Sequence, residues 1–184
     1  AGGGGRAARR AVRVVAGEFK GRRLHAPRGA ATRPTADRVR EALFSILGDV
    51  SAARVLDLYA GSGALGIEAL SRGAETALFV ERDRRALAAL RRNLEAVGVD
   101  VEVRDQDVLR FLVHPEGVFD LVFCDPPYDE ASRVAAPLSE ALPAMLSEDA
   151  RIVTESDKRN PLVLPLPLLA ERTYGDTRIA IHSA

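Results

Sequence analysis

Three observations predict an α/β fold built on a mostly parallel, Rossmann-like sheet. From Arg54 onward, short apolar runs typical of strands alternate with helical patterns of about 10–15 residues, as in sheets with helices on both faces. A glycine-rich loop follows the first of these strands. Near the C-terminus, Gly175-Asp176 separates two β-like runs as a two-residue hairpin turn does. The sheet is therefore expected to finish with an antiparallel pair of strands.

The first fifty residues are expected to form an extension outside this sheet. Residues 1–11 hold four glycines, three arginines and no core-forming side chain, and are predicted to be a disordered basic leader. Two β-like runs, Val12–Val15 and Arg22–His25, predict a small basic hairpin. A helix capped by Thr35 follows, since apolar side chains recur there at helical spacing. These side chains are Val39, Leu43, Phe44 and Leu47.

The remaining pattern predicts one α/β domain over residues 51–184, preceded by the extension at 12–50. Its expected strands are Val55–Tyr59, Thr76–Glu81, Val99–Val103, Phe119–Cys124, Ala150–Glu155, Leu168–Tyr174 and Thr177–His182. Its expected helices are one ending near Arg72, then Asp83–Val97, Val108–Leu112 and Val134–Leu146.

Composition excludes several classes of protein. The single cysteine, Cys124, cannot form an internal disulfide or a cysteine-rich zinc site, and the three histidines show no metal-ligand spacing. The longest uncharged stretch, Asn160–Ala170, contains three prolines and is too short to span a membrane. We therefore expect a cytoplasmic protein without a metal centre, and a monomer.

Charge is divided unevenly along the chain although the total is zero. Residues 1–40 hold eleven Lys and Arg against two Asp and Glu, a net charge of +9, and the other 144 residues carry −9. This division indicates a basic arm that meets a polyanion, attached to a domain with another task. A solvated basic tail without a partner is the alternative.

The loop after the first strand predicts a nucleoside site. Asp57 ends that strand, and the segment DLYAGSGALG brings Tyr59, Gly61, Ser62 and Gly63 next to a helix N-terminus. The letters also match the G-x-G-x-x-G dinucleotide pattern. A carboxylate at Asp57, however, would repel a diphosphate and attract a cation. A nucleoside that carries a sulfonium, S-adenosylmethionine, fits this site better.

Acidic residues end the next two strands. Glu81 can accept the ribose hydroxyls, and Asp107 can accept a hydrogen from the adenine amino group. Asp105 competes with Asp107 for the adenine, although its side chain should face the other side of the sheet. Helix capping is an equally good explanation for Asp107.

The segment Asp125-Pro126-Pro127-Tyr128 directly follows a buried strand. Its prolines stiffen the turn and leave carbonyl acceptors. Because the lone pair of an exocyclic amine is delocalised into its ring, the Asp125 carboxylate and the Pro126 carbonyl are needed to grip the N–H hydrogens. Tyr128 can stack on the base. The segment therefore predicts methylation of a planar amine.

These motifs resemble those of the RsmD family, bacterial 16S rRNA guanine-N2 methyltransferases. The resemblance rests on VLDLYAGSGALGIEALSRGA, on DPPY, and on the N-terminal GEFKGRRL and TRPTADRVREALF, and covers residues 12–182. It implies the class I S-adenosylmethionine-dependent methyltransferase fold, a seven-stranded sheet with a C-terminal antiparallel pair. It also implies a 16S rRNA substrate in the small ribosomal subunit or its assembly intermediate, and S-adenosylhomocysteine as product. The leader before Val12 has no counterpart in the family.

The resemblance implies a role for each matching residue. Asp57, Gly61 and Gly63 would line the methionine part of the cofactor, Glu81 its ribose, and Asp107 with Val108 its adenine. Thr35 would close that pocket. The target base would meet Asp125, Pro126, Pro127 and Tyr128, and RNA phosphates would meet Lys20, Arg22, Arg23, Arg33 and Arg38.

Three other functions remain open on the sequence. An adenine-N6 or glutamine-amide methyltransferase would use the same site chemistry. A nicotinamide-dependent oxidoreductase would explain the glycine pattern but leave DPPY without a role. A non-enzymatic RNA-binding module would explain only residues 6–40.

Overall fold

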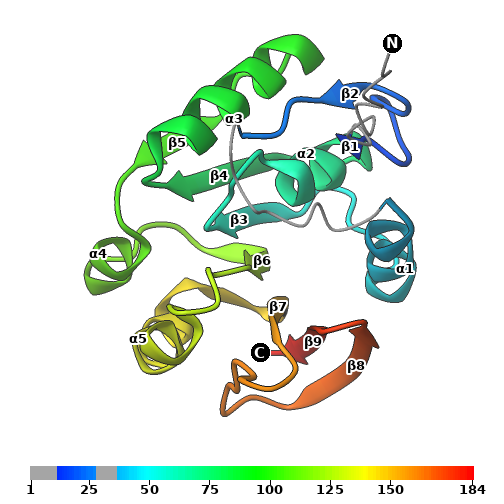
Figure 1. The fold of residues 1–184 in the computed structure, drawn as a ribbon. Helices are drawn as coiled ribbons and strands as arrows, with labels where there is room; N and C mark the ends of the chain where they lie inside the picture. The colour runs from blue at the N-terminus through cyan, green and yellow to red at the C-terminus, as the bar shows by residue number, and fades with distance from the viewer. Residues whose placement is uncertain (1–11, 28–36) are drawn as a thin grey trace, which may run out of the picture.

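The computed structural model describes residues 12–27 and 37–184 (Figure 1). A seven-stranded sheet has the order β5-β4-β3-β6-β7-β9-β8, and β1 and β2 form a separate antiparallel pair. The strands are β1 Val12–Arg13, β2 Arg23–Leu24, β3 Arg54–Leu58, β4 Thr76–Glu81, β5 Glu102–Asp105, β6 Phe119–Cys124, β7 Leu146–Asp157, β8 Leu168–Tyr174 and β9 Thr177–Ser183. The helices are α1 Asp37–Leu47, α2 Ala64–Ser71, α3 Arg84–Val97, α4 Val108–Val113 and α5 Ala131–Met145.

The topology confirms the predicted sheet. Strands β3 to β7 pair in parallel, whereas β9 pairs antiparallel with both β7 and β8. The chain enters the sheet at β3, the middle one of the five parallel strands, continues outward through β4 to β5, and then returns to add β6 on the other side of β3. Strand order therefore reverses between β3 and β6, and ligands of open α/β sheets bind at such a point, beside the carboxyl ends of the strands.

Helices cover both faces of the sheet and create two cores. On one face, α1, α2, α3 and the N-terminal hairpin bury a cluster that includes Phe19, Phe44 and Phe79 (Figure 1). On the other face, α4 and α5 bury a cluster that includes Phe111 and Leu138. Side chains of a strand alternate between the two faces, so residues two apart point to the same face. The core cluster of one strand residue therefore shows the face of the residue two positions later.

Several predicted boundaries were wrong by a few residues. The third strand of the sheet begins at Glu102 rather than Val99, because backbone pairing with β4 starts only at that residue. Helix α5 begins at Ala131, three residues before the predicted start. Strand β7 extends to Asp157, since its pairing with β9 continues as far as Thr177.

The N-terminal hairpin is fixed to α2 by buried polar groups. The Glu68 carboxylate accepts hydrogen bonds of 2.7 and 3.0 Å from the backbone N–H groups of Val15 and Ala16. The Ser71 hydroxyl accepts from the Phe19 N–H at 2.9 Å. A side-chain carbon at Gly17 would lie 1.7 Å from the Ser71 carbonyl oxygen, so only glycine permits this approach. The hairpin is therefore part of the same folded body as the sheet.

Three predictions concern the part of the chain that the structure does not describe: the leader at 1–11, Thr35 as helix cap and pocket cover, and Arg33. Among the described residues, no helix is both long enough and apolar enough to span a membrane.

Candidate active site

A row of carboxylates marks the carboxyl ends of four adjacent parallel strands. In sheet order these are Glu81 on β4, Asp57 on β3, Asp125 directly after β6, and Glu155 on β7. All four follow strand residues of the first core cluster at even spacing, so they share the face covered by α1, α2 and α3. Four neighbouring acids on one face make this edge the candidate active site.

The glycine loop leaves β3 through left-handed backbone. Tyr59, Gly61 and Gly63 have φ values of 58°, 58° and 78°. A side-chain carbon at Gly63 would lie 2.4 Å from the Leu90 side chain, so α2 could not approach α3 so closely with a larger residue. At Gly61 the nearest atom would be the Tyr59 carbonyl oxygen at 3.9 Å. No other atom of residues 12–27 and 37–184 would lie within 4 Å of that carbon, so the described part of the chain leaves this space open to a ligand.

Asp57 of β3 is buried, and its side chain lies against the first turn of α2. Its side chain is 2% exposed, and one carboxylate oxygen accepts a 3.0 Å hydrogen bond from the Gly66 backbone N–H. Burial, together with the charge of Glu81, raises the pKa of Asp57 to about 8, although the hydrogen bond from the Gly66 N–H favours the ionised form. A cationic ligand group beside Asp57 would relieve this cost.

Glu81 fixes the glycine loop to the end of β4. One carboxylate oxygen accepts the Gly61 N–H at 2.8 Å, and the other accepts the N–H groups of Arg82 and Asp83, both at 2.8 Å. Since each carboxylate oxygen has two lone pairs, the oxygen bound to Gly61 retains one for a ligand hydroxyl. Ribose binding by Glu81 remains a prediction.

Asp107 caps α4, the explanation that the sequence left open beside adenine binding. Its carboxylate accepts from the N–H groups of Leu109 and Arg110, at 2.9 and 3.3 Å, and forms an ion pair with Arg82. Arg82 also pairs with Glu130, the residue that precedes α5. Arg82 thus links the start of α4 to the start of α5, the helix that follows the DPPY turn.

Asp105 lies apart from Asp107. It ends β5 in register with Glu81, and its exposed carboxylate lies 3.9 Å from the Arg91 guanidinium on α3. No contact of the described residues assigns the adenine to either acid.

The DPPY turn stands beside the glycine loop. Leu58 and Cys124 are register partners on β3 and β6, and the Asp125 N–H points to the Leu58 carbonyl at 3.5 Å. Asp125 is half-buried, Pro126 is buried, and Tyr128 is 51% exposed. Burial, followed by the charges of Glu155 and Asp57, holds the pKa of Asp125 well above its usual range. An exposed ring next to an acceptor-rich turn can receive a flat base.

Two residues of this region escaped the sequence reasoning. No motif in the sequence around Glu155 marks it as a site residue. It lies beside Asp125 only because β7 pairs with β6 in this register. Asn93, fully buried on α3, donates to the carbonyls of His25 and Ser62 at 3.0 and 2.9 Å and accepts from the His25 N–H at 2.7 Å. Asn93 therefore joins the end of the hairpin to the glycine loop, a link that a helix pattern does not signal.

The predicted RNA-contacting residues lie in different places. Arg22 donates to the Ala96 carbonyl at 2.9 Å, near the end of α3. Helix α3 begins at Arg84, close to Glu81, and Ala96 lies about 18 Å further along this helix. The Arg22 contact is therefore distant from the edge of the sheet that carries the four acids. Lys20 and Arg23 are exposed on the same hairpin, and Arg38 is exposed in the first turn of α1. If the hairpin binds RNA, it does so at a distance from the target base.

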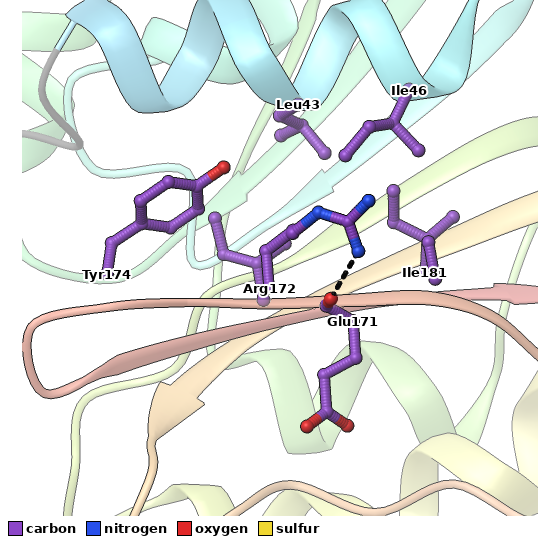
Figure 2. Close-up of a pocket in the computed structure, with 8 residues that line it drawn as sticks. Leu43, Ile46, Glu171, Arg172, Tyr174 and Ile181 are labelled. Carbon is purple, nitrogen blue, oxygen red and sulfur yellow. Dashed lines mark hydrogen bonds between the residues drawn. The ribbon is translucent and has the colours of Figure 1, made fainter.

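A small apolar pocket elsewhere contains none of the predicted site residues. Figure 2 shows it between α1 and the β8–β9 hairpin, with Leu43 and Ile46 facing Tyr174, Arg172 and Ile181. No group of three or more His, Cys, Asp or Glu side chains within 12–27 and 37–184 is arranged to hold a metal ion.

Comparison with known proteins identifies the family. The family model described as "Conserved hypothetical protein 95" matches residues 12–183. YlbH of Bacillus subtilis (strain 168) is 41% identical over 180 residues, which cover 93% of this chain and 98% of the relative. Ribosomal RNA small subunit methyltransferase D of Haemophilus influenzae is 38% identical over 174 residues, 89% of each chain.

Solved structures agree with this family and with the fold. The Escherichia coli protein yhhF superposes with a TM-score of 0.82 at 34% identity, covering 94% of this chain and 97% of that one. A ribosomal protein L11 methylase from Lactobacillus delbrueckii shares the fold alone, with a TM-score of 0.64 at 20% identity over 79% and 77% of the two chains. The chain has the class I methyltransferase fold and belongs to the conserved hypothetical protein 95 family, the RsmD family.

Proposed function

We propose that this protein transfers a methyl group from S-adenosylmethionine to the exocyclic N2 amine of a guanine in 16S rRNA. Relatives in Haemophilus influenzae and Escherichia coli are named ribosomal RNA small subunit methyltransferase D, which supports an rRNA substrate. A fold neighbour, SMU.776, was solved in complex with S-adenosylhomocysteine, which supports the cofactor class. The assembled or assembling small subunit is the proposed partner.

One observation carries the proposal: the DPPY turn and the glycine loop leave neighbouring strands at the same edge of the sheet. A base held against Tyr128 and Asp125 therefore lies next to a ligand held over Gly61. Holding two reactants side by side in a fixed geometry supplies a large part of the rate acceleration of bimolecular reactions.

The residues present suit the cofactor. When bound, S-adenosylmethionine supplies an electrophilic methyl group on a positively charged sulfur. Asp57 is buried at this edge of the sheet, and a positively charged ligand group beside it would stabilise the ionised, negatively charged form of its carboxylate. The open space at Gly61 accommodates the approach of the ligand, and Glu81 keeps an oxygen lone pair for a ribose hydroxyl.

At the other side of the site, the chain orients the amine. The Asp125 carboxylate and the Pro126 carbonyl accept the two hydrogens of the amino group, which favours a pyramidal nitrogen whose localised lone pair points toward the methyl group. Asp125 stabilises the positive charge that grows on this nitrogen and takes the proton late. To reach the turn, the guanine must be unstacked, at a cost of a few kcal/mol unless it is already unpaired.

A transfer assay with nucleoside analysis tests the proposal. Labelled S-adenosylmethionine is incubated with small ribosomal subunits, naked 16S rRNA or DNA, and the nucleosides are then separated. We expect label in N2-methylguanosine from the subunit, and none with the Asp125→Ala variant. Asp129→Asn, which changes an exposed carboxylate beside the turn, is the matched control. Label in N6-methyladenine, or none in any nucleic acid, would contradict the proposal.

A further inference from the structure

Glu155 is the immediate neighbour of Asp125 across two parallel strands. Cys124 on β6 is in register with Thr154 on β7, and each acid is the next residue of its chain. Phe123 and Val153, two residues before the acids, both belong to the first core cluster, so the two carboxylates point to the same face. The charge of Glu155 contributes to the raised pKa of Asp125, as expected for adjacent carboxylates.

Among the described residues, the backbone and carboxylates at this corner of the site offer several acceptors, and the turn itself supplies few donors. Pro126 and Pro127 have no N–H groups, and the Asp125 N–H points away to the Leu58 carbonyl. The Pro127 carbonyl already accepts from the Glu130 N–H at 2.8 Å. The strand register places Asp125 and Glu155 side by side, and the Pro126 carbonyl belongs to the residue that follows Asp125 in the turn. A ligand edge made of donors fits such a surface.

The Watson–Crick edge of guanine has this character next to its reactive amine. The 2-amino group has two hydrogens, and the adjacent ring nitrogen N1 carries a third. Two of the acceptors hold the amino group, so one acceptor remains for N1–H. Adenine differs at this point, because its N1 is a lone-pair acceptor beside the 6-amino group and would face a carboxylate unfavourably.

We propose that Glu155 is the specificity-determining residue that accepts the N1–H of the target guanine, so that the site selects guanine against bases with an unprotonated N1. The inference rests on the proposed function and adds the base selectivity of that same site. Nothing in it requires a change in cofactor binding, since Asp57 and Glu81 lie on the other side of Asp125 in the sheet.

Substitution of the target base tests the inference directly. Small subunits are reconstituted with either guanine or 2,6-diaminopurine at the position that the wild-type protein methylates. Both bases carry the 2-amino group, but diaminopurine has a lone pair at N1. We expect the wild type to favour guanine by at least about tenfold in kcat/KM, the cost of facing two acceptors in a desolvated site.

Glu155→Gln should reduce this ratio to about twofold or less, because the amide can donate to N1 of diaminopurine. Glu155→Asp keeps the carboxylate and should retain most of the preference for guanine. Glu148→Gln, an exposed acid near the opposite end of β7, should leave the ratio unchanged. Calorimetry with S-adenosylmethionine checks that each variant is folded and binds the cofactor as the wild type does.

The pH dependence supplies a readout that a purely structural role would not move. In the part of the chain that the structure describes, the titratable groups that face Asp125 are Glu155 on β7 and Asp57 on β3, with Cys124 preceding it on β6. Removing the charge of Glu155 should lower the pKa of Asp125 and shift the rising limb of kcat/KM to lower pH, whereas Glu155→Asp should not. The inference is wrong if Glu155→Gln keeps both the wild-type preference for guanine over diaminopurine and the wild-type pH dependence of kcat/KM. If the wild type labels no guanine at all, the proposed function itself fails.

Discussion

The Asp57 carboxylate accepts a hydrogen bond from the backbone N–H of Gly66, in the first turn of α2. This N–H is one of the donors that a helix leaves unpaired at its N-terminus, so the acid of β3 caps the helix that follows the glycine loop. The single hydrogen bond does not offset burial, and the pKa of Asp57 is raised to about 8. Burial thus favours the protonated form of Asp57, and a cationic ligand beside it would favour the ionised form.

Cofactor affinity should consequently depend on pH. A cationic ligand favours the ionised form of Asp57, so binding near pH 7 should release a proton, and affinity should rise by up to about tenfold per pH unit below the free pKa and level off above it. Calorimetry in buffers of different ionisation enthalpy measures both effects. Asp57→Asn should weaken binding and abolish the proton release; a wild-type release of protons in this variant would exclude Asp57 as their source.

The Asp125 carboxylate should be needed for transfer but not for cofactor binding. We expect Asp125→Ala to lower kcat by at least about 10²-fold, because the acceptor that orients the amine and takes its proton is lost. The dissociation constant for S-adenosylmethionine should stay within about twofold of the wild-type value, as measured by calorimetry. Unaltered turnover would remove Asp125 from the mechanism.

Docking of the hairpin should depend on the close approach of Gly17 to Ser71. Gly17 and Gly21 both have left-handed backbone, with φ of 82° and 83°, but only at Gly17 would a side-chain carbon meet another atom, at 1.7 Å. Gly21→Ala should cost about 1–2 kcal/mol of stability, the strain of left-handed alanine. Gly17→Ala should cost clearly more and loosen the hairpin, detected as faster hydrogen exchange at Val15 and Phe19. Equal effects of the two substitutions would contradict this packing.

The hairpin cations should contribute to RNA binding without taking part in chemistry. Lys20 and Arg23 are the better targets, because Arg22 also holds the hairpin to α3. Lys20→Gln with Arg23→Gln should weaken binding of 16S rRNA and reduce the slope of log K against log salt by about 0.7–0.9 per charge removed. Arg104→Gln, which removes a cation already paired with Glu102 and Glu116, serves as the control. An unchanged slope in the double variant would show that the hairpin is not the RNA arm.

Local signals sufficed for the fold and for most of the candidate site. The alternation of strands and helices, the glycine loop and the acids at Asp57 and Glu81 can be read from neighbouring residues, and the predicted parallel sheet with its C-terminal antiparallel pair is confirmed. The DPPY turn was found in the same way, since a buried strand and two prolines fix its position at the edge of the sheet.

Contacts between distant segments could not be predicted in this way. Glu155 reaches the site only through the register of β7 against β6, and register follows from the whole sheet. Arg40 belongs to a charged helix segment but is fully buried, with its guanidinium 3.8 Å from the Glu68 carboxylate. The position of the hairpin depends on that same Glu68, fifty-three residues from Val15.

A structure of the protein with S-adenosylhomocysteine and the small subunit tests the central claim most directly. The account predicts the target guanine against Tyr128, with its N2 atom about 2.6–3.2 Å from a carboxylate oxygen of Asp125 and from the Pro126 carbonyl. It also predicts that N2 points toward the sulfur of the bound nucleoside, in line for transfer. A DPPY turn that faces away from the nucleoside, or a guanine amine beyond reach of Asp125, would contradict the account.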